Sequence, residues 1–134
     1  MQSRFTKQAQ EALSHAADTA AMLGHGYIGS EHLLLGLIQT EGSLASTILI
    51  NNEVTDERVT NLVYQLIAPD SQISVKEPTG YTPRVRRILE NASKEAVRFK
   101  SELIGTEHIL ISILKESESV AARLLNTIGV SIKK

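Results

Sequence analysis

Two short elements of this chain carry the side chains best suited to binding chemistry. Residues 29–32 read G-S-E-H and residues 105–108 read G-T-E-H. A glutamate in the first turn of a helix stabilises that helix by about 0.3–1 kcal/mol through the helix dipole, which is enough to explain both glutamates. An exposed carboxylate can also hold a guanidinium through two parallel hydrogen bonds. Glu31 and Glu107 are therefore candidate ligands for a cation, with helix stabilisation as the alternative.

Two threonines stand where helices are expected to begin. Thr6 and Thr82 each precede a helical run, and a hydroxyl at that position accepts a hydrogen bond from an orphan backbone N–H. The start of a helix also attracts anions. If such a helix start lies beside one of the glutamates, the cleft between them would accept a group that has a cation next to an anion. The sequence leaves this arrangement open.

The histidines could hold a metal ion, but their pattern argues against it. The chain has four: His15, His25, His32 and His108. His25 and His32 are the candidate ligands, yet the second half of the chain has Ser101 where the first half has His25. We expect His32 and His108 to donate hydrogen bonds to nearby backbone and so to fix their loops. We predict no metal site.

The common catalytic motifs are absent. The chain has no G-x-x-x-x-G-K phosphate loop, no G-x-S-x-G and no H-E-x-x-H. It also has no cysteine, which excludes disulfides and thiolate metal ligands. We therefore expect this segment to be non-catalytic and to use no cofactor.

The elements that must position these residues occur twice. Residues 5–54 align with residues 81–130 without a gap, at an offset of 76. The alignment superimposes the two G-[ST]-E-H elements and also Thr6 on Thr82. A repeat of this kind predicts two modules packed about a pseudo-two-fold axis, so that a site made by one copy should occur twice.

Each copy predicts three helices. Apolar residues at positions 9, 12, 13, 16, 20 and 23 form a helical stripe that recurs 76 residues later. The second helix, expected at 31–39 and 107–115, is apolar on most sides and should be buried. The expected N-caps are Thr6 and Thr82 for the first helix and Ser30 and Thr106 for the second. Ser43 and Ser119 should start the third helix.

Copy one adds a fourth helix. Thr55 should cap it, Asp56 and Glu57 complement its dipole, and its apolar stripe lies at positions 59, 62, 63, 66 and 67. Prolines and Gly80 prevent helix formation in the linker at 68–80. Copy two stops before the matching helix, so we expect an eighth helix that is missing or lies downstream, and a chain that is a segment of a longer protein.

Length and charge narrow the class of protein. The 134 residues suit one domain, 1–134, made of repeat one at 5–67, the linker at 68–80 and repeat two at 81–130. The net charge of −1 gives no overall attraction to nucleic acid. Copy two is more basic than copy one, and its cluster at Arg84, Arg86 and Arg87 is either a solvated helix face or a patch that attracts anions.

No segment indicates export or membrane insertion. No run approaches the roughly 18 apolar residues of a membrane span, and the N-terminus lacks the apolar core of a signal peptide. We expect a cytoplasmic location, with neither nucleic acid nor a membrane as a partner.

Four motifs together carry a resemblance to a known family. They are G-S-E-H-L-L-L-G-L, G-T-E-H-I-L, R-F-T-x-x-A-x-x-A-L and Y-T-P-R-x-x-x-I-L. With them the chain closely resembles the Clp N-terminal repeat domain, most of all the version at the front of ClpC-type AAA+ unfoldases. The resemblance covers essentially the whole chain. It implies an all-α domain of two pseudo-symmetric four-helix repeats in one compact unit, with the eighth helix truncated or absent here.

The resemblance also implies a function. In a Clp/Hsp100 unfoldase this domain receives adaptor proteins and protein substrates, and the ATPase ring behind it threads them into the ClpP peptidase. ATP would then be used only by the downstream modules. ClpC-type domains also recognise phosphoarginine as a degradation mark, at one site per repeat. Carried over to this chain, Glu31 and Glu107 would hold the guanidinium, and Thr6 and Thr82 would hold the phosphate.

Other interpretations stay open. The chain could be a stand-alone Clp-N-like accessory protein that regulates a Clp ATPase or peptidase. A small hydrolase or a nucleic-acid binder is disfavoured, because no nucleophile–base pair repeats and the net charge is near zero. ClpA-type and ClpB-type relatives use the same fold with other partners, so the branch is open. In the family the ring forms through the ATPase modules, and we therefore expect the isolated domain to be a monomer.

The two copies differ just before their glutamates. Residues 24–26 read G-H-G, whereas residues 100–102 read K-S-E. This difference leaves room for different loop shapes and different affinities at the two sites.

Overall fold

The computed structural model describes residues 5–23, 25–66 and 80–128, and the side chains of residues 64–66 and 128 are not included. Residues 67–79 of the predicted fourth helix and linker, and residues 129–134, lie outside this range. The described residues confirm the all-α prediction. They form seven helices: α1 Lys7–Met22, α2 Ser30–Gln39, α3 Leu44–Asn51, α4 Asp56–Leu66, α5 Pro83–Arg98, α6 Thr106–Lys115 and α7 Val120–Ile128.

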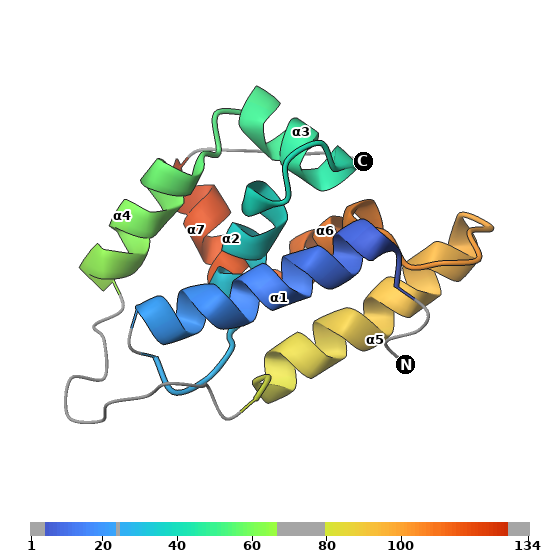
Figure 1. Cartoon of the computed structure of the whole chain (residues 1–134), viewed down its shortest axis with the longest axis horizontal. Coiled ribbons are helices and arrows are strands. Elements are labelled where there is room, and N and C mark those ends of the chain that lie inside the picture. Colours follow the sequence, from blue (N-terminus) through green and yellow to red (C-terminus); the bar gives the residue numbers. More distant parts are fainter. Residues whose placement is uncertain (1–4, 24, 67–79, 129–134) are drawn as a thin grey trace.

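Backbone hydrogen bonds join the first segment of each repeat to a loop of the other repeat. The segment that enters α1 pairs with the loop before α6, where the Thr6 N–H donates to the Ile104 carbonyl at 2.9 Å. The segment that enters α5 pairs with the loop before α2, where the Thr82 N–H donates to the Ile28 carbonyl at 3.1 Å. In accord with this pseudo-two-fold relation, α1 and α5 run in opposite directions (Figure 1).

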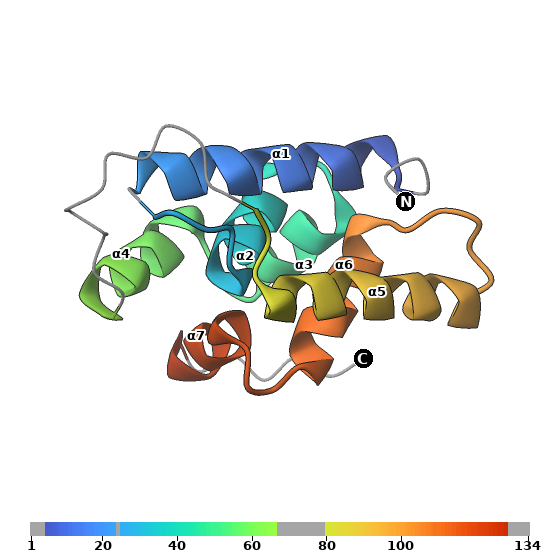
Figure 2. The same ribbon diagram turned by 90° about the horizontal axis from the view of Figure 1, so that it is seen from below.

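The second helix of each repeat lies in the middle of the molecule, as its all-round apolar sequence predicts. Nine of the ten residues of α2 are buried, and α2 lies between α1 and α7 (Figure 2). In repeat two, α6 is buried along most of its length. Among the described residues no single helix is long and apolar enough to cross a membrane. The pair α2 and α3 reaches that length and composition only together, with a bend of 96° between them.

Most of the predicted helix caps are confirmed. The Thr6 hydroxyl accepts from the Ala9 N–H and the Thr82 hydroxyl accepts from the Val85 N–H, both at 3.1 Å. The remaining confirmed caps are Ser43, Thr55 and Ser119, whose hydroxyls accept from the N–H three residues ahead. These side chains satisfy donors that a helix start would otherwise leave without a partner.

The expected caps of the second helices are wrong by one residue. The N-caps are Gly29 and Gly105, and Ser30 and Thr106 are the first residues of α2 and α6. The Ser30 hydroxyl instead accepts from the Ala121 N–H of α7 at 3.0 Å. The Thr106 hydroxyl accepts in the same way from the N–H of Ala45 in α3. Each hydroxyl therefore caps a helix of the other repeat, which sequence periodicity alone could not reveal.

A close approach between α1 and α2 depends on Gly36. A methyl group at Gly36 would collide with the carbonyl oxygen of Ala12, an atom of the backbone of α1 that cannot easily move away. Repeat two has Ser112 at the matching position, and its hydroxyl donates to the Ile88 carbonyl at 2.7 Å. The first pair of helices is thus in direct backbone contact, whereas a hydroxyl bridges the second pair.

We predict that Gly36→Ala lowers the free energy of unfolding by about 1–3 kcal/mol, because the added methyl group forces α1 and α2 apart. Ser112→Ala is the matched control, and loss of its one hydrogen bond should cost about 1 kcal/mol. Urea unfolding followed by circular dichroism measures both changes. A Gly36→Ala protein as stable as the unmodified chain would contradict the close contact.

Candidate functional site

Each candidate site is built from both repeats. We call residues 5–6 and 81–82, which lead into α1 and α5, the entry segments, and each pairs with a loop of the other repeat. Thr82 therefore lies beside the loop that leads to Glu31, and Thr6 lies beside the loop that leads to Glu107. We call these two places the Glu31 site and the Glu107 site. Of the four residues proposed from the sequence, Glu31 and Thr82 line one cavity. Thr6 adjoins the loop before Glu107 through Ile104 but is not among the residues that line the Glu107 groove.

The Glu31 site is a cavity of about 320 Å³ where three helices begin. Glu31 and Thr82 both line it, together with Tyr27, Arg84 and residues 118–120, which contain Glu118, the cap Ser119 and the first residue of α7. The starts of α2, α5 and α7 meet here, and the positive ends of their dipoles favour negative charge. The Thr82 oxygen accepts the capping hydrogen bond, so its hydroxyl hydrogen stays available to an incoming oxygen.

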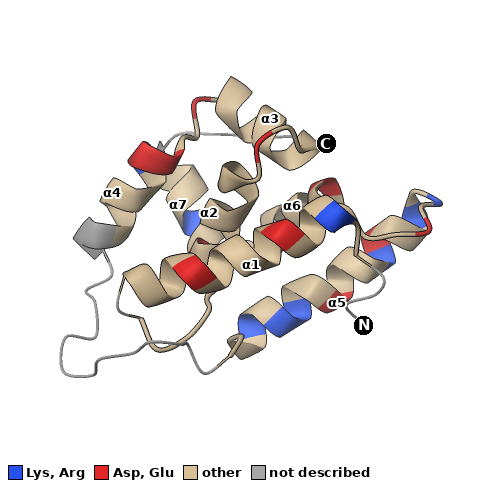
Figure 3. Ribbon diagram, in the orientation of Figure 1, with Lys and Arg blue, Asp and Glu red and all other residues tan. Residues whose placement is uncertain are grey.

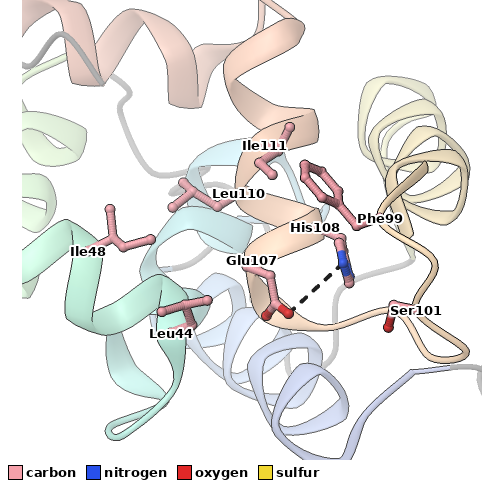
Figure 4. A pocket seen from close by; sticks show the side chains of 8 residues that line it. All are labelled: Leu44, Ile48, Phe99, Ser101, Glu107, His108, Leu110 and Ile111. Atoms are coloured by element: carbon pink, nitrogen blue, oxygen red, sulfur yellow. Dashed lines mark ion pairs between the residues drawn. The ribbon is translucent and has the colours of Figure 1, made fainter. Parts of the chain in front are cut away.

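The Glu107 site opens onto an apolar groove, also of about 320 Å³. In Figure 4, Leu44 and Ile48 of α3 face Leu110 of α6, and Glu107 lies between them and His108. Phe99 and Ile111 line the groove farther along. This site therefore combines a carboxylate with exposed hydrocarbon, whereas most of the residues that line the Glu31 site are polar.

Both glutamates fold back over the glycine that precedes them by two residues. A side-chain carbon at Gly29 would come within 2.6 Å of the Glu31 Oε1, and one at Gly105 would come equally close to the Glu107 Oε1. The φ angles at these glycines are −99° and −98°, which any residue can adopt. Glycine is therefore needed here for space and not for a positive φ, and the carboxylates lie at the positive ends of α2 and α6.

The two carboxylates differ in exposure. The Glu31 side chain is 3% exposed and that of Glu107 is 37% exposed. Burial raises the pKa of Glu31, although its own backbone N–H and the Tyr27 hydroxyl, which bind the ionised form, act in the opposite direction. Among the described residues, no lysine or arginine forms an ion pair with either glutamate.

The hydrogen bonds of the two histidines are the same in both repeats and differ from those predicted. His32 and His108 do not donate to backbone: the Gly29 N–H donates to the His32 Nδ1, and the Gly105 N–H to the His108 Nδ1, each at 2.8 Å. The neutral His32 ring therefore carries its proton on Nε2, which lies 2.6 Å from the His25 Nδ1 and donates to it. Burial lowers the pKa of His25, and burial together with His25 lowers that of His32 to about 3.

This hydrogen bonding does not suit a metal ion. The ligand atoms of His25, Glu31 and His32 do lie within 4.8 Å of one another. However, a neutral histidine that binds a metal through Nε2 carries its proton on Nδ1, where the Gly29 N–H already points. Metal binding would therefore break the hydrogen bond that caps α2.

The basic cluster predicted on the first helix of repeat two is partly neutralised. Figure 3 shows basic residues at the start of α5. Arg84 and Arg87 lie 3.4 and 3.6 Å from the Glu116 carboxylate, and Arg86 is exposed. Arg84 also lines the Glu31 site. The cluster is thus mostly a solvated helix face, with one arginine at the edge of a cavity.

Tyr27 was not singled out from the sequence, and Arg84 was named there only as part of a basic cluster and not as a residue of this site. Tyr27 binds the Glu31 carboxylate, and Arg84 lines the same cavity. A signal for both was present in the repeat alignment, where Tyr27 is opposite Leu103 and Arg84 is opposite Gln8. Positions at which the two copies differ, next to positions at which they agree, would have indicated them.

The histidine pair predicts how stability depends on pH. The pKa of His32 falls from an ordinary value of 6.5 to about 3 on folding, so the unfolded chain binds a proton first as the pH falls. The contribution of His32 to the free energy of unfolding is therefore fully present above pH 6.5. Below that pH it is lost at up to about 1.4 kcal/mol per pH unit. Glu31, with its raised pKa, acts in the opposite direction at lower pH.

Urea unfolding at a series of pH values measures this slope. His25→Ser should make it shallower, because it removes one buried imidazole and its effect on His32. Equal slopes for the unmodified chain and His25→Ser would contradict the prediction.

We also predict that zinc does not stabilise the fold, because metal binding must break the hydrogen bond between Gly29 and His32. The midpoint of thermal unfolding should be the same with zinc as with a chelator. A rise in the midpoint with zinc that disappears in His25→Ser would show that a metal site exists.

Residues 4–128 match the family of the Clp repeat (R) N-terminal domain. A relative from Bacillus subtilis, the negative regulator of genetic competence ClpC/MecB, is 39% identical over 131 residues, which cover 98% of this chain and 16% of the relative. The chain thus spans about one sixth of the length of that relative.

Solved structures share the fold. The N-terminal domain of the chaperone ClpD from Arabidopsis thaliana superimposes with a TM-score of 0.78 at 21% identity, covering 98% of this chain and 91% of that domain. The ClpV N-domain in its complex with a VipB peptide gives a TM-score of 0.75 at 16% identity, covering 95% of this chain and 78% of that domain. With the family match over nearly its whole length, the chain belongs to the Clp repeat N-terminal domain family.

Proposed function

We propose that this chain is the docking domain of a Clp/Hsp100 AAA+ unfoldase and that it binds proteins marked by phosphoarginine. It would deliver adaptors and marked substrates to an ATPase ring that feeds the ClpP peptidase. In this function the domain performs no catalysis itself, and ATP is used by other modules. Glu107 with Thr6, and Glu31 with Thr82, are the ligands for the mark.

The observation that carries the proposal is the exchange of entry segments between the repeats. It supports the proposal because a hydroxyl-capped helix start adjoins the loop that leads to each glutamate, and Glu31 and Thr82 line one cavity. A phosphorylated guanidinium has a cation next to an anion. The carboxylate matches the first through paired hydrogen bonds, and the helix start with its hydroxyl matches the second.

Two comparisons support the wider part of the proposal. The B. subtilis relative is a ClpC-type protein that is much longer than this chain. The ClpV N-domain, which has the same fold, has been solved with a peptide bound. A domain of this fold can therefore hold a short segment of another protein, as a docking function requires.

We predict that free phosphoarginine binds to the purified chain in a saturable manner, whereas arginine or inorganic phosphate at the same concentration does not. Glu107→Gln should weaken binding at its site at least tenfold, because it removes the charge that pairs with the guanidinium. Isothermal titration calorimetry measures the affinity. Absence of any heat or saturation with phosphoarginine would overturn the proposal.

Thr6→Asp separates ligand binding from helix capping. Aspartate is as good an N-cap as threonine, so α1 should stay folded, but its negative charge repels the phosphate. Thr6→Ser keeps the hydroxyl and is the control. Binding at the Glu107 site should be lost in Thr6→Asp and retained in Thr6→Ser, with circular dichroism unchanged in both.

A further inference from the structure

The two sites have the same scaffold around their glutamates. Each carboxylate folds over a glycine at the same distance, and each following histidine accepts from that glycine's N–H at 2.8 Å. The side chains nevertheless differ more than tenfold in exposure, 3% for Glu31 and 37% for Glu107. The cause must therefore lie in the residues that cover the carboxylates and not in the helices that carry them.

Tyr27 covers Glu31. Both residues line the same cavity. Burial, then the charge of Glu31 and then the contact between the Tyr27 hydroxyl and the Glu31 carboxylate raise the pKa of Tyr27 to about 12. The phenol therefore keeps its proton and donates it to the carboxylate at any ordinary pH. One face of the acceptor that a guanidinium would use is thus occupied by a residue of the chain itself.

Two buried histidines hold the Tyr27 ring in place. The ring stacks parallel to that of His25, with centroids 5.5 Å apart and planes 2° apart, and lies 5.4 Å from the His32 ring. His25 is itself held by the 2.6 Å hydrogen bond to His32. Tyr27 is therefore fixed over the carboxylate by stacking on a hydrogen-bonded pair and is not a freely rotating surface side chain.

Repeat two keeps the buried histidine, His108, but lacks the tyrosine and the second histidine. Leu103 replaces Tyr27 and is 43% exposed, so it can neither donate to Glu107 nor shield it well. Ser101 replaces His25, and its hydroxyl donates to the Leu103 carbonyl at 2.7 Å. The Glu107 carboxylate consequently faces an open groove (Figure 4).

We propose that Tyr27, positioned by His25, closes the Glu31 site against a guanidinium, so that this chain presents one open site at Glu107 and one closed site at Glu31. This inference rests on the proposed binding of phosphoarginine and determines which of the two sites takes it. A guanidinium can reach Glu31 only if it displaces the Tyr27 hydroxyl and enters a buried position. The Glu31 site keeps its helix starts, Thr82 and Arg84, and the Glu118 carboxylate also lines it.

The test follows each site separately. Phosphoarginine is titrated into the ¹⁵N-labelled chain, and the amide signals of Gly29 and Gly105 report on the Glu31 and Glu107 sites. In the unmodified chain, the Gly105 signal should saturate at a concentration at least tenfold lower than the Gly29 signal. Glu31→Gln should leave the response of Gly105 unchanged.

Exchanging the covering residues should exchange the behaviour. Tyr27→Leu copies repeat two and should bring the Gly29 affinity within about threefold of the Gly105 affinity, a difference of only about 0.7 kcal/mol. His25→Ser should shift the Gly29 response in the same direction without changing that of Gly105. Glu31→Gln added to Tyr27→Leu should abolish the gain.

Leu103→Tyr is an independent test. Leu103 is exposed, so the substitution should not disturb folding. It should weaken binding at Gly105. Equal affinities at Gly29 and Gly105 in the unmodified chain, unchanged by Tyr27→Leu, would overturn the closure of the Glu31 site while the proposed function stands. Absence of phosphoarginine binding in every variant would overturn the proposed function instead.

Discussion

The exchange of entry segments between the repeats is the constraint on which the rest of this structure depends. Two backbone hydrogen bonds, from Thr6 to Ile104 and from Thr82 to Ile28, tie the start of each repeat to the loop of the other. The helices that follow are then oriented by those loops. Each glutamate-bearing helix start therefore lies beside a first-helix start and a third-helix start of the opposite repeat, so neither repeat alone could assemble a complete site.

Helix starts that lie close together bring positive dipole ends and unsatisfied N–H groups into one place, and nearby side chains compensate for both. Three sets of orphan N–H groups converge at the Glu31 site, and their dipoles add. Hydroxyl groups accept hydrogen bonds from some of these N–H groups. Thr82 caps its own helix, whereas Ser30 accepts from the start of α7 across the interface. The carboxylate of Glu31 supplies the remaining negative charge, and Gly29 leaves the space in which it folds back. The same groups that stabilise the fold therefore make the surroundings suitable for an anion.

The sequence predicts individual helices better than it predicts their partners. Helical spacing of apolar residues and hydroxyl caps such as Thr6 and Ser43 are local signals, because they act within one turn of the chain, and the structure confirms them. The targets of Ser30 and Thr106 depend on which segments meet across the repeat interface. A hydroxyl beside a glycine looks like a cap for its own helix, and only the packing shows that Gly29 takes that position while Ser30 reaches Ala121.

A duplicated scaffold explains why a cover over one carboxylate is structurally permissible. The helix start itself is stabilised by Glu31 whether or not the carboxylate can be reached from outside, since the dipole acts over the first turn in either case. Tyr27 adds a hydrogen bond that partly offsets the burial of this carboxylate, and the histidine pair beneath it fills space that would otherwise be open. In repeat two the same first-turn role is met by a half-exposed Glu107, whose charge is solvated and needs no phenol. Fold stability therefore constrains the glutamates at both positions but leaves the residues above them free to diverge, and access to the carboxylate is set by those residues alone.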